Sequence, residues 1–122
     1  MSWESSKTLI ADGLTIDSET VYEYSNAVAL NPAELAHIQI TGDSGGTTDN
    51  LRIDVFTTID ASAENWDTVP ITSVELNCVS GDPESISIPI SGVYKFRLGF
   101  LRVGSTDTIV VDANVKTDNV DA

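Results

Sequence analysis

The sequence predicts an all-β domain, an antiparallel β-sandwich that is jelly-roll-like and has about eight strands. Two observations lead to this prediction. Apolar side chains recur at every second position in at least five segments, which is typical of strands that bury one face. No helical pattern is long enough to cover a sheet, so two sheets that face each other are the economical way to bury these side chains.

The strand signals extend along the whole chain. The clearest lies in 51–60, where Leu51, Ile53, Val55 and Ile59 share one face and polar side chains share the other. Within 69–76 the apolar phase slips between Ile71 and Val74, which predicts a β-bulge. In chain order, the segments with strand signals are 8–11, 20–24, 36–41, 51–60, 69–76, 85–90, 94–100 and 109–116.

Turn residues separate these segments. Glycine, serine and aspartate are frequent in 42–50, 80–83 and 104–107. Asn31 and Pro32 are suited to begin a helix, but the strand pattern at 38–40 follows too soon for more than a turn. We divide the chain into an N-terminal arm or edge segment, 1–18, and a β-sandwich domain, 19–122.

Length and composition favour one core and exclude several partners. The 122 residues fit a single domain, and 41% of them are hydrophobic. With 19 acidic and 6 basic residues, the net charge is −13, which repels nucleic acids and anionic membrane surfaces. A single cysteine, Cys78, cannot form an internal disulfide, and we expect it to be a buried apolar side chain. With neither a signal-peptide pattern nor an apolar run of membrane-spanning length, we expect a protein assembled in a cytoplasm.

Catalytic and metal-binding patterns are not recognisable. His37 is the one histidine, and it falls on the polar face of its strand, so we interpret it as a surface residue. Oxygen ligands for calcium occur in two loops, but their spacing matches no established calcium loop, and solvated turns are the simpler interpretation. These residues are Asp43, Ser44, Asp49 and Asn50 in one loop, and Asp60, Glu64, Asn65 and Asp67 in the other. We therefore expect no enzyme activity, no cofactor and no metal site.

Two tryptophans are candidates for binding. Trp66 lies in a polar loop, where it either stacks on a sugar or a partner, or folds back to cap the end of the sandwich. Trp3 is too close to the terminus to join the core, so we expect it to anchor an arm on a neighbouring subunit. The basic side chains at outward strand positions are expected to form cross-strand ion pairs. They are Arg52, Lys95, Arg97 and Lys116.

Residues 49–60 followed by 65–70, together with 91–109, resemble small β-sandwich virion proteins of tailed bacteriophages that decorate or cement the capsid. The resemblance lies in the pattern of strand and turn residues over the last two thirds of the chain. It implies a structural protein without catalytic residues, a homotrimer bound to the major capsid protein on the outside of the head shell. In such an assembly Trp3, Leu9 and Ile10 would grip the shell, and the protein would be located in the virion.

Two other functions compete with capsid decoration. Trp66 and the acidic loops favour a carbohydrate-binding module or a fibre adhesin domain. A hydrolase on a jelly-roll scaffold would need two carboxylates of raised pKa in a pocket, and the sequence does not indicate such a site.

Overall fold

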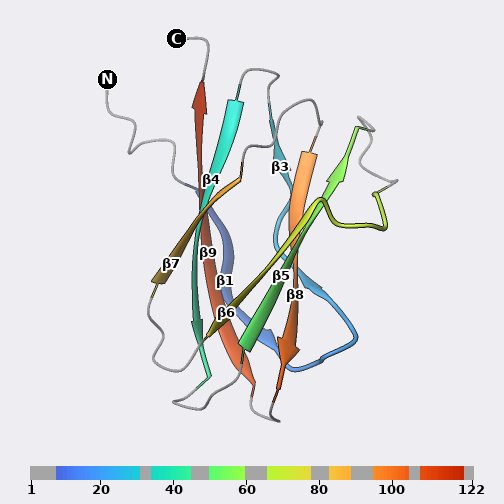
Figure 1. The fold of residues 1–122 in the computed structure, drawn as a ribbon. Coiled ribbons are helices and arrows are strands. Elements are labelled where there is room, and N and C mark those ends of the chain that lie inside the picture. The colour runs from blue at the N-terminus through green and yellow to red at the C-terminus, as the bar shows by residue number, and fades with distance from the viewer. Residues whose placement is uncertain are drawn as a thin grey trace.

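The computed structural model describes residues 8–30, 34–44, 50–59, 66–77, 83–88, 95–104 and 108–119. These residues form nine strands in two antiparallel sheets, and no helix occurs among them. Figure 1 shows the sheets as two layers, with β4 and β9 in one and β5 and β8 in the other. The predicted all-β sandwich is confirmed.

The first sheet has four strands. From one edge to the other they are β1 (Thr8–Ile16), β9 (Ile109–Asn119), β4 (Glu34–Asp43) and β7 (Pro83–Ile88). The second sheet has the order β2 (Glu23–Tyr24), β8 (Lys95–Val103), β5 (Asn50–Thr58) and β6 (Thr72–Asn77). A further short strand, β3 (Val28–Ala29), also pairs with β8.

Strands β2 and β3 are two halves of one strand that a bulge interrupts. Between Tyr24 and Val28 there is one more residue than between their partners on β8, Gly99 and Phe96. Ser25 closes the break, because its backbone N–H donates to the Leu98 carbonyl at 2.9 Å and its hydroxyl accepts from the Leu98 N–H at 3.0 Å. With β2 and β3 counted as one strand, the two sheets have eight strands in jelly-roll order, as predicted.

The core lies between the sheets and follows the predicted alternation. Every second residue of β4, β5, β8 and β9 turns inward, since successive side chains in a strand point to opposite faces. Burying these side chains is the main favourable term in folding. The buried hydrophobic cluster consists of Ile10, Ala11, Ile16, Leu30, Ala36, Ile38, Ile40, Leu51, Ile53, Val55, Phe96, Leu98, Phe100, Ile109, Val111, Ala113 and Val115.

Three local expectations need correction. Ile59 does not join the core, because β5 ends at Thr58 and the Ile59 side chain is 80% exposed. The bulge expected between Ile71 and Val74 does not occur, because β6 begins only at Thr72 and keeps its register with β5. The register shifts lie in β1 instead, on either side of Ala11.

The segment assigned to the arm is part of the sandwich wherever the structure describes it. Strand β1 is an edge strand and contributes Ile10, Ala11 and Ile16 to the core. Residues 1–7, and with them any true arm, lie outside the described residues, as do Cys78 and the turns at 45–49 and 105–107.

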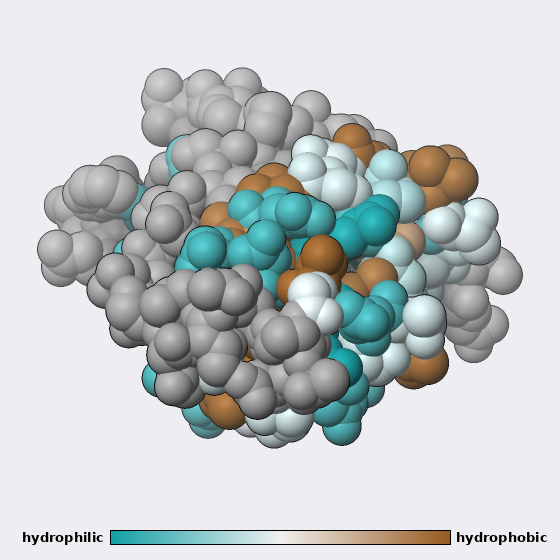
Figure 2. Space-filling view, turned by 60° about the horizontal axis from the view of Figure 1, so that its bottom comes forward, coloured by the Kyte–Doolittle hydropathy of each residue, from teal (hydrophilic) through white to brown (hydrophobic). Residues whose placement is uncertain are grey.

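Hydrophobic side chains also occur at the surface, but in small groups. Figure 2 brings the lower part of Figure 1 forward and shows these groups separated by hydrophilic residues. The large exposed hydrophobic side chains are Leu9, Val21, Tyr24, Ile59, Val69, Ile71 and Val110. Within the described ranges, no helix is long and apolar enough to cross a membrane.

Candidate functional site

Four aromatic side chains and one arginine gather on the outer face of the five-stranded sheet. We call Tyr22, Tyr24, Phe56, Trp66 and Arg97 the aromatic–arginine cluster. The Tyr22 and Tyr24 rings are stacked with centroids 5.7 Å apart, and both meet the Phe56 ring edge-on, at 5.1 and 6.0 Å. These are the offset and T-shaped geometries that aromatic pairs prefer.

Sheet pairing explains why these residues meet. Arg97 is directly opposite Phe56 in the β5–β8 ladder, and Tyr24 is opposite Gly99 in the β2–β8 ladder. Since β8 turns Phe96, Leu98 and Phe100 inward, its intervening residues face outward.

Arg97 joins the two sides of the cluster. Its guanidinium carbon lies 3.8 Å from the Tyr24 ring centroid and 4.5 Å from the Trp66 ring centroid, over both rings. Both distances are within the range of a cation–π interaction. Phe56 is buried, whereas Tyr24 is 41% exposed and Tyr22, Trp66 and Arg97 are half-buried. The cluster therefore presents polar and aromatic edges to solvent, and these rest on the buried Phe56 ring.

Gly99 provides the space that the rings occupy. A Cβ atom at this position would lie 2.8 Å from both Phe56 Cε2 and Tyr22 Cδ1, and 3.2 Å from Tyr24 Cε1. Two of these contacts are shorter than real Cβ atoms show, so the rings can lie this low on the sheet only because residue 99 has no side chain.

A buried carboxylate fixes Tyr22. Asp54 has no exposed surface, and its carboxylate accepts hydrogen bonds from the Tyr22 hydroxyl, from the Ser73 hydroxyl at 2.5 Å and from Arg52 Nε at 3.1 Å. Because a buried carboxylate is stable only when it is paired, these three donors and Asp54 form one unit. The network spans β5, β6 and the residue before β2.

The network shifts three pKa values, and that of Arg52 is raised by its hydrogen bond to Asp54 and by the Asp54 charge. Burial alone would raise the pKa of Asp54, but the hydrogen bonds from Ser73, Tyr22 and Arg52 outweigh it and hold that pKa below its ordinary value. Burial, together with the hydrogen bond to Asp54 and its negative charge, raises the pKa of Tyr22 to about 12.

Tyr22 therefore has a spectroscopic signature. Because its folded-state pKa is raised, the protonated phenol stabilises the fold fully below the unfolded-state value of about 10, and this contribution is lost as the pH rises through 12. We expect tyrosinate absorbance at 295 nm to show a step near pH 12 that is absent in Tyr22→Phe. If the tyrosinate step that Tyr22→Phe removes lies near pH 10 instead, the network is contradicted.

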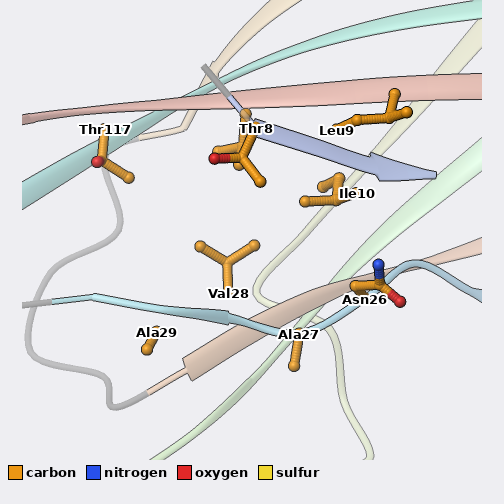
Figure 3. Close-up of a pocket in the computed structure, with 9 residues that line it drawn as sticks. Thr8, Leu9, Ile10, Asn26, Ala27, Val28, Ala29 and Thr117 are labelled. Atoms are coloured by element: carbon orange, nitrogen blue, oxygen red, sulfur yellow. The ribbon is translucent and has the colours of Figure 1, made fainter. Parts of the chain in front are cut away.

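A groove opens between the edge strand β1 and the short strand β3. Its volume is about 420 Å³. Figure 3 shows Thr8 and Ile10 across the gap from Val28, and the backbone N–H of Asn26 donates to the Ile10 carbonyl at 2.9 Å, which ties the two sheets together. The residues that line the groove are Thr8, Leu9, Ile10, Asn26, Ala27, Val28, Ala29, Val115 and Thr117.

The residues predicted to bind a partner do not form one site. Trp3 lies outside the described residues. Leu9 is 46% exposed beside the groove, whereas Ile10 is only 3% exposed and belongs to the core, so the intact fold does not offer it for gripping a shell. Trp66 lies in the aromatic–arginine cluster, where its ring packs against Arg97 on the outer face of a sheet.

The other candidate residues are dispersed. His37 is half-buried on β4, in register with Lys116 and Ser87. Four of the eight loop residues considered for calcium lie outside the described ranges, namely Asp49, Asp60, Glu64 and Asn65. The described residues contain no group of three or more His, Cys, Asp or Glu side chains that could hold a metal ion.

The expected cross-strand ion pairs are not what the structure shows for the arginines of this face. Arg52 pairs with Asp54, two residues further along its own strand. Arg97 stacks on aromatic rings.

Most of the cluster was not predicted from the sequence. Trp66 was a candidate, but Tyr22, Tyr24, Phe56 and Arg97 were not considered as binding residues. Two signals could have revealed part of it. Phe56 falls on the outward face of its strand, between the polar residues Asp54 and Thr58 of that face. Gly99 interrupts a strand of large side chains.

A scan against protein-family models and a search of curated proteins found no match. Among solved structures, the chain is similar to the N-terminal endo-1,4-β-D-xylanase 10B of Clostridium thermocellum, its CBM22-1-GH10 modules complexed with xylohexaose. The TM-score is 0.59, the identity is 14%, and the match covers 94% of this chain and 25% of that chain. The likeness shows the fold, a β-sandwich, and the chain spans a quarter of that structure's length.

Two weaker likenesses were also found. Dimeric latent PorU from Porphyromonas gingivalis matches with a TM-score of 0.46 and 12% identity, over 93% of this chain and 12% of that one. A family two carbohydrate esterase from Cellvibrio japonicus matches with a TM-score of 0.43 and 6% identity, over 93% of this chain and 33% of that one.

Proposed function

We propose that this chain is a non-enzymatic binding module that holds a glycan against the outer face of its five-stranded sheet. The observation that supports this proposal most strongly is the aromatic–arginine cluster. Sugar rings have apolar C–H faces that pack on aromatic rings and hydroxyl groups that need hydrogen-bond partners. The cluster offers both, since Tyr24 and Trp66 are partly exposed and carry polar atoms at their edges, and Tyr22 adds ring surface.

The rigidity of the cluster supports the same function. Tyr22 is held by Asp54, Phe56 is buried beneath the tyrosines, and Trp66 is packed against Arg97. A surface that is ordered before the ligand arrives loses less conformational entropy on binding. In addition, the xylanase structure that shares the fold is complexed with xylohexaose, so this fold occurs in a protein with an oligosaccharide ligand.

Trp66 provides the direct test. On a glycan array we expect the wild-type protein to bind a subset of glycans, and Trp66→Ala to bind them at least about tenfold more weakly, which corresponds to about 1.4 kcal/mol for one lost stacking surface. Val69→Ala, at a 74% exposed position three residues away, should bind like the wild type. Circular dichroism must show that both variants are folded. A wild-type array without signal, with and without calcium, would exclude glycan binding.

The second candidate is decoration of a phage head, which the resemblance of residues 49–60, 65–70 and 91–109 suggested. The groove beside the edge strand β1 favours it, because Leu9 is 46% exposed there and offers an apolar contact at the side of the sandwich. Mass spectrometry of purified particles should then detect the chain in stoichiometric amounts. Its absence from such particles would exclude this role without affecting glycan binding.

A further inference from the structure

We propose that the glycan is acidic and that Arg97 binds a carboxylate on one of its sugar rings. This inference rests on the proposed function, because it assigns the chemical class of ligand to the same cluster. In an acidic protein, Arg97 is a cation that packs on two aromatic rings.

Arg97 is unusual among the described residues. The chain has 19 acidic and only 6 basic residues, so carboxylate partners are abundant. Nevertheless, the contacts of the Arg97 guanidinium within the described part of the chain are with the Tyr24 and Trp66 rings, and its buried Nε has no hydrogen-bond partner there. Arg52 on the same face is different, because Asp54 accepts its Nε–H.

The stacking leaves the hydrogen-bond donors of Arg97 available. The guanidinium group is planar, and its five N–H bonds lie in that plane. Aromatic rings that lie over the plane use its faces and not its donors. Because Nε is buried and the side chain as a whole is half-buried, the terminal Nη groups are the donors that, within the described part of the chain, a ligand would meet. Two parallel N–H groups match the two oxygens of a carboxylate.

The rings also make this cation more effective. Two aromatic rings within 4.5 Å of the guanidinium carbon shield part of the group from water, and electrostatic attraction is stronger where the local dielectric constant is low. A sugar that approached Arg97 through its carboxylate would meet the exposed parts of Tyr24 and Trp66 at once. One ligand could therefore use its charge and the apolar face of its ring together.

The charge around the cluster agrees with an anionic ligand. Strand register places Lys95, Arg97 and Arg52 on the outer face of β8 and β5, so half of the six basic residues of the chain lie on one face of one sheet. Arg52 already has carboxylates beside it, since Asp54 accepts its Nε–H and Glu75 lies in register with it. Asp67 accepts from the Thr57 hydroxyl at 3.1 Å. The net charge of −13 acts at long range and is screened by salt, whereas Arg97 acts on contact.

The test compares two probes that differ only at the carboxyl group, oligogalacturonides with free carboxylates and the same oligomers as uncharged methyl esters. By isothermal titration calorimetry, the wild-type protein should bind the free acid about tenfold more tightly, the factor expected for one charge-assisted hydrogen-bond pair. Arg97→Gln should remove this preference, and Arg97→Lys should retain part of it. Lys116→Gln, on the other sheet, removes the same charge and should keep the preference.

The possible results distinguish failure of this inference from failure of the proposed function. Binding of both oligomers, or of neutral glycans only, without preference for the acid would overturn this inference and leave the proposed function in place. A preference that survives Arg97→Gln would also overturn it, because another group would then recognise the carboxylate. If the wild-type protein binds none of these oligomers and no glycan on the array, sulfated ones included, the proposed function and this inference both fail.

Discussion

Asp54→Ala is expected to destabilise the fold by about 2–4 kcal/mol, a large share of the stability of a small domain. The substitution removes the acceptor shared by Tyr22, Ser73 and Arg52 and leaves a space at a position without exposed surface. For a domain of this size, such a loss lowers the melting temperature by roughly 10 °C. Thermal unfolding followed by circular dichroism measures it.

Two further variants make this result specific. Asp54→Asn keeps the shape and one acceptor oxygen, and its amide can donate to the Tyr22 hydroxyl, so it should lose less than Asp54→Ala. Glu75→Gln is the matched control, because Glu75 is exposed on β6 and is paired in register with Arg52. We expect it to change stability by no more than about 0.5 kcal/mol. Equal stability of Asp54→Ala and Glu75→Gln would mean that the network does not support the fold.

The stabilising effect of Asp54 also depends on pH. Its folded-state pKa is lowered, so its contribution is complete above the unfolded-state value of about 4 and is lost as the pH falls through the folded-state value. The stability difference between the wild type and Asp54→Ala should therefore be constant near neutral pH and should shrink below about pH 4.

Gly99→Val is expected to disrupt the aromatic–arginine cluster. The new side chain would overlap the positions of Phe56 Cε2 and Tyr22 Cδ1, so the rings must move, and overpacking of this kind typically costs about 1–3 kcal/mol. Displaced rings no longer present the same surface, so glycan binding should fall at least about tenfold. Near-ultraviolet circular dichroism, which reports the packing of aromatic side chains, should change as well.

Gly13→Ala is the control for Gly99→Val. Gly13 has a φ of +63°, a conformation that costs an alanine about 1–2 kcal/mol, although a Cβ there would touch nothing within 4 Å. It lies on β1 in the other sheet, so this variant should lose a similar amount of stability and retain glycan binding. If Gly99→Val binds glycans like Gly13→Ala, the rings over Gly99 are not the binding surface.

The fold was predictable because its signal is local. Burial of one sheet face imposes a period of two on every long strand, and the pattern of Ile109, Val111, Ala113 and Val115 in β9 is visible without knowledge of its neighbours. The short strand β3 was missed because two residues, Val28 and Ala29, are too few to establish a period. Ile59 was misplaced because the alternation continues in sequence beyond the point where β5 ends.

The candidate site was not predictable in the same way because it depends on pairing between distant strands. Tyr24 and Arg97 are 73 residues apart in the chain and meet only because β2 and β8 are neighbours. Strand order in a sandwich is set by the whole set of connections, which the period of one segment does not reveal. Trp66 could be predicted as a binding residue because it lies in a polar loop. Its partner Arg97 could not be predicted, because their contact depends on the fold.

The most direct test of the account is a nuclear magnetic resonance titration of the ¹⁵N-labelled protein with a glycan selected on the array. We predict that the largest shift changes occur at the Trp66 indole N–H, the Arg97 side chain and the Gly99 amide, while Leu9 and Val28 at the groove stay unchanged. Saturable shift changes confined to the groove residues, with the outer face of the five-stranded sheet unaffected, would contradict it.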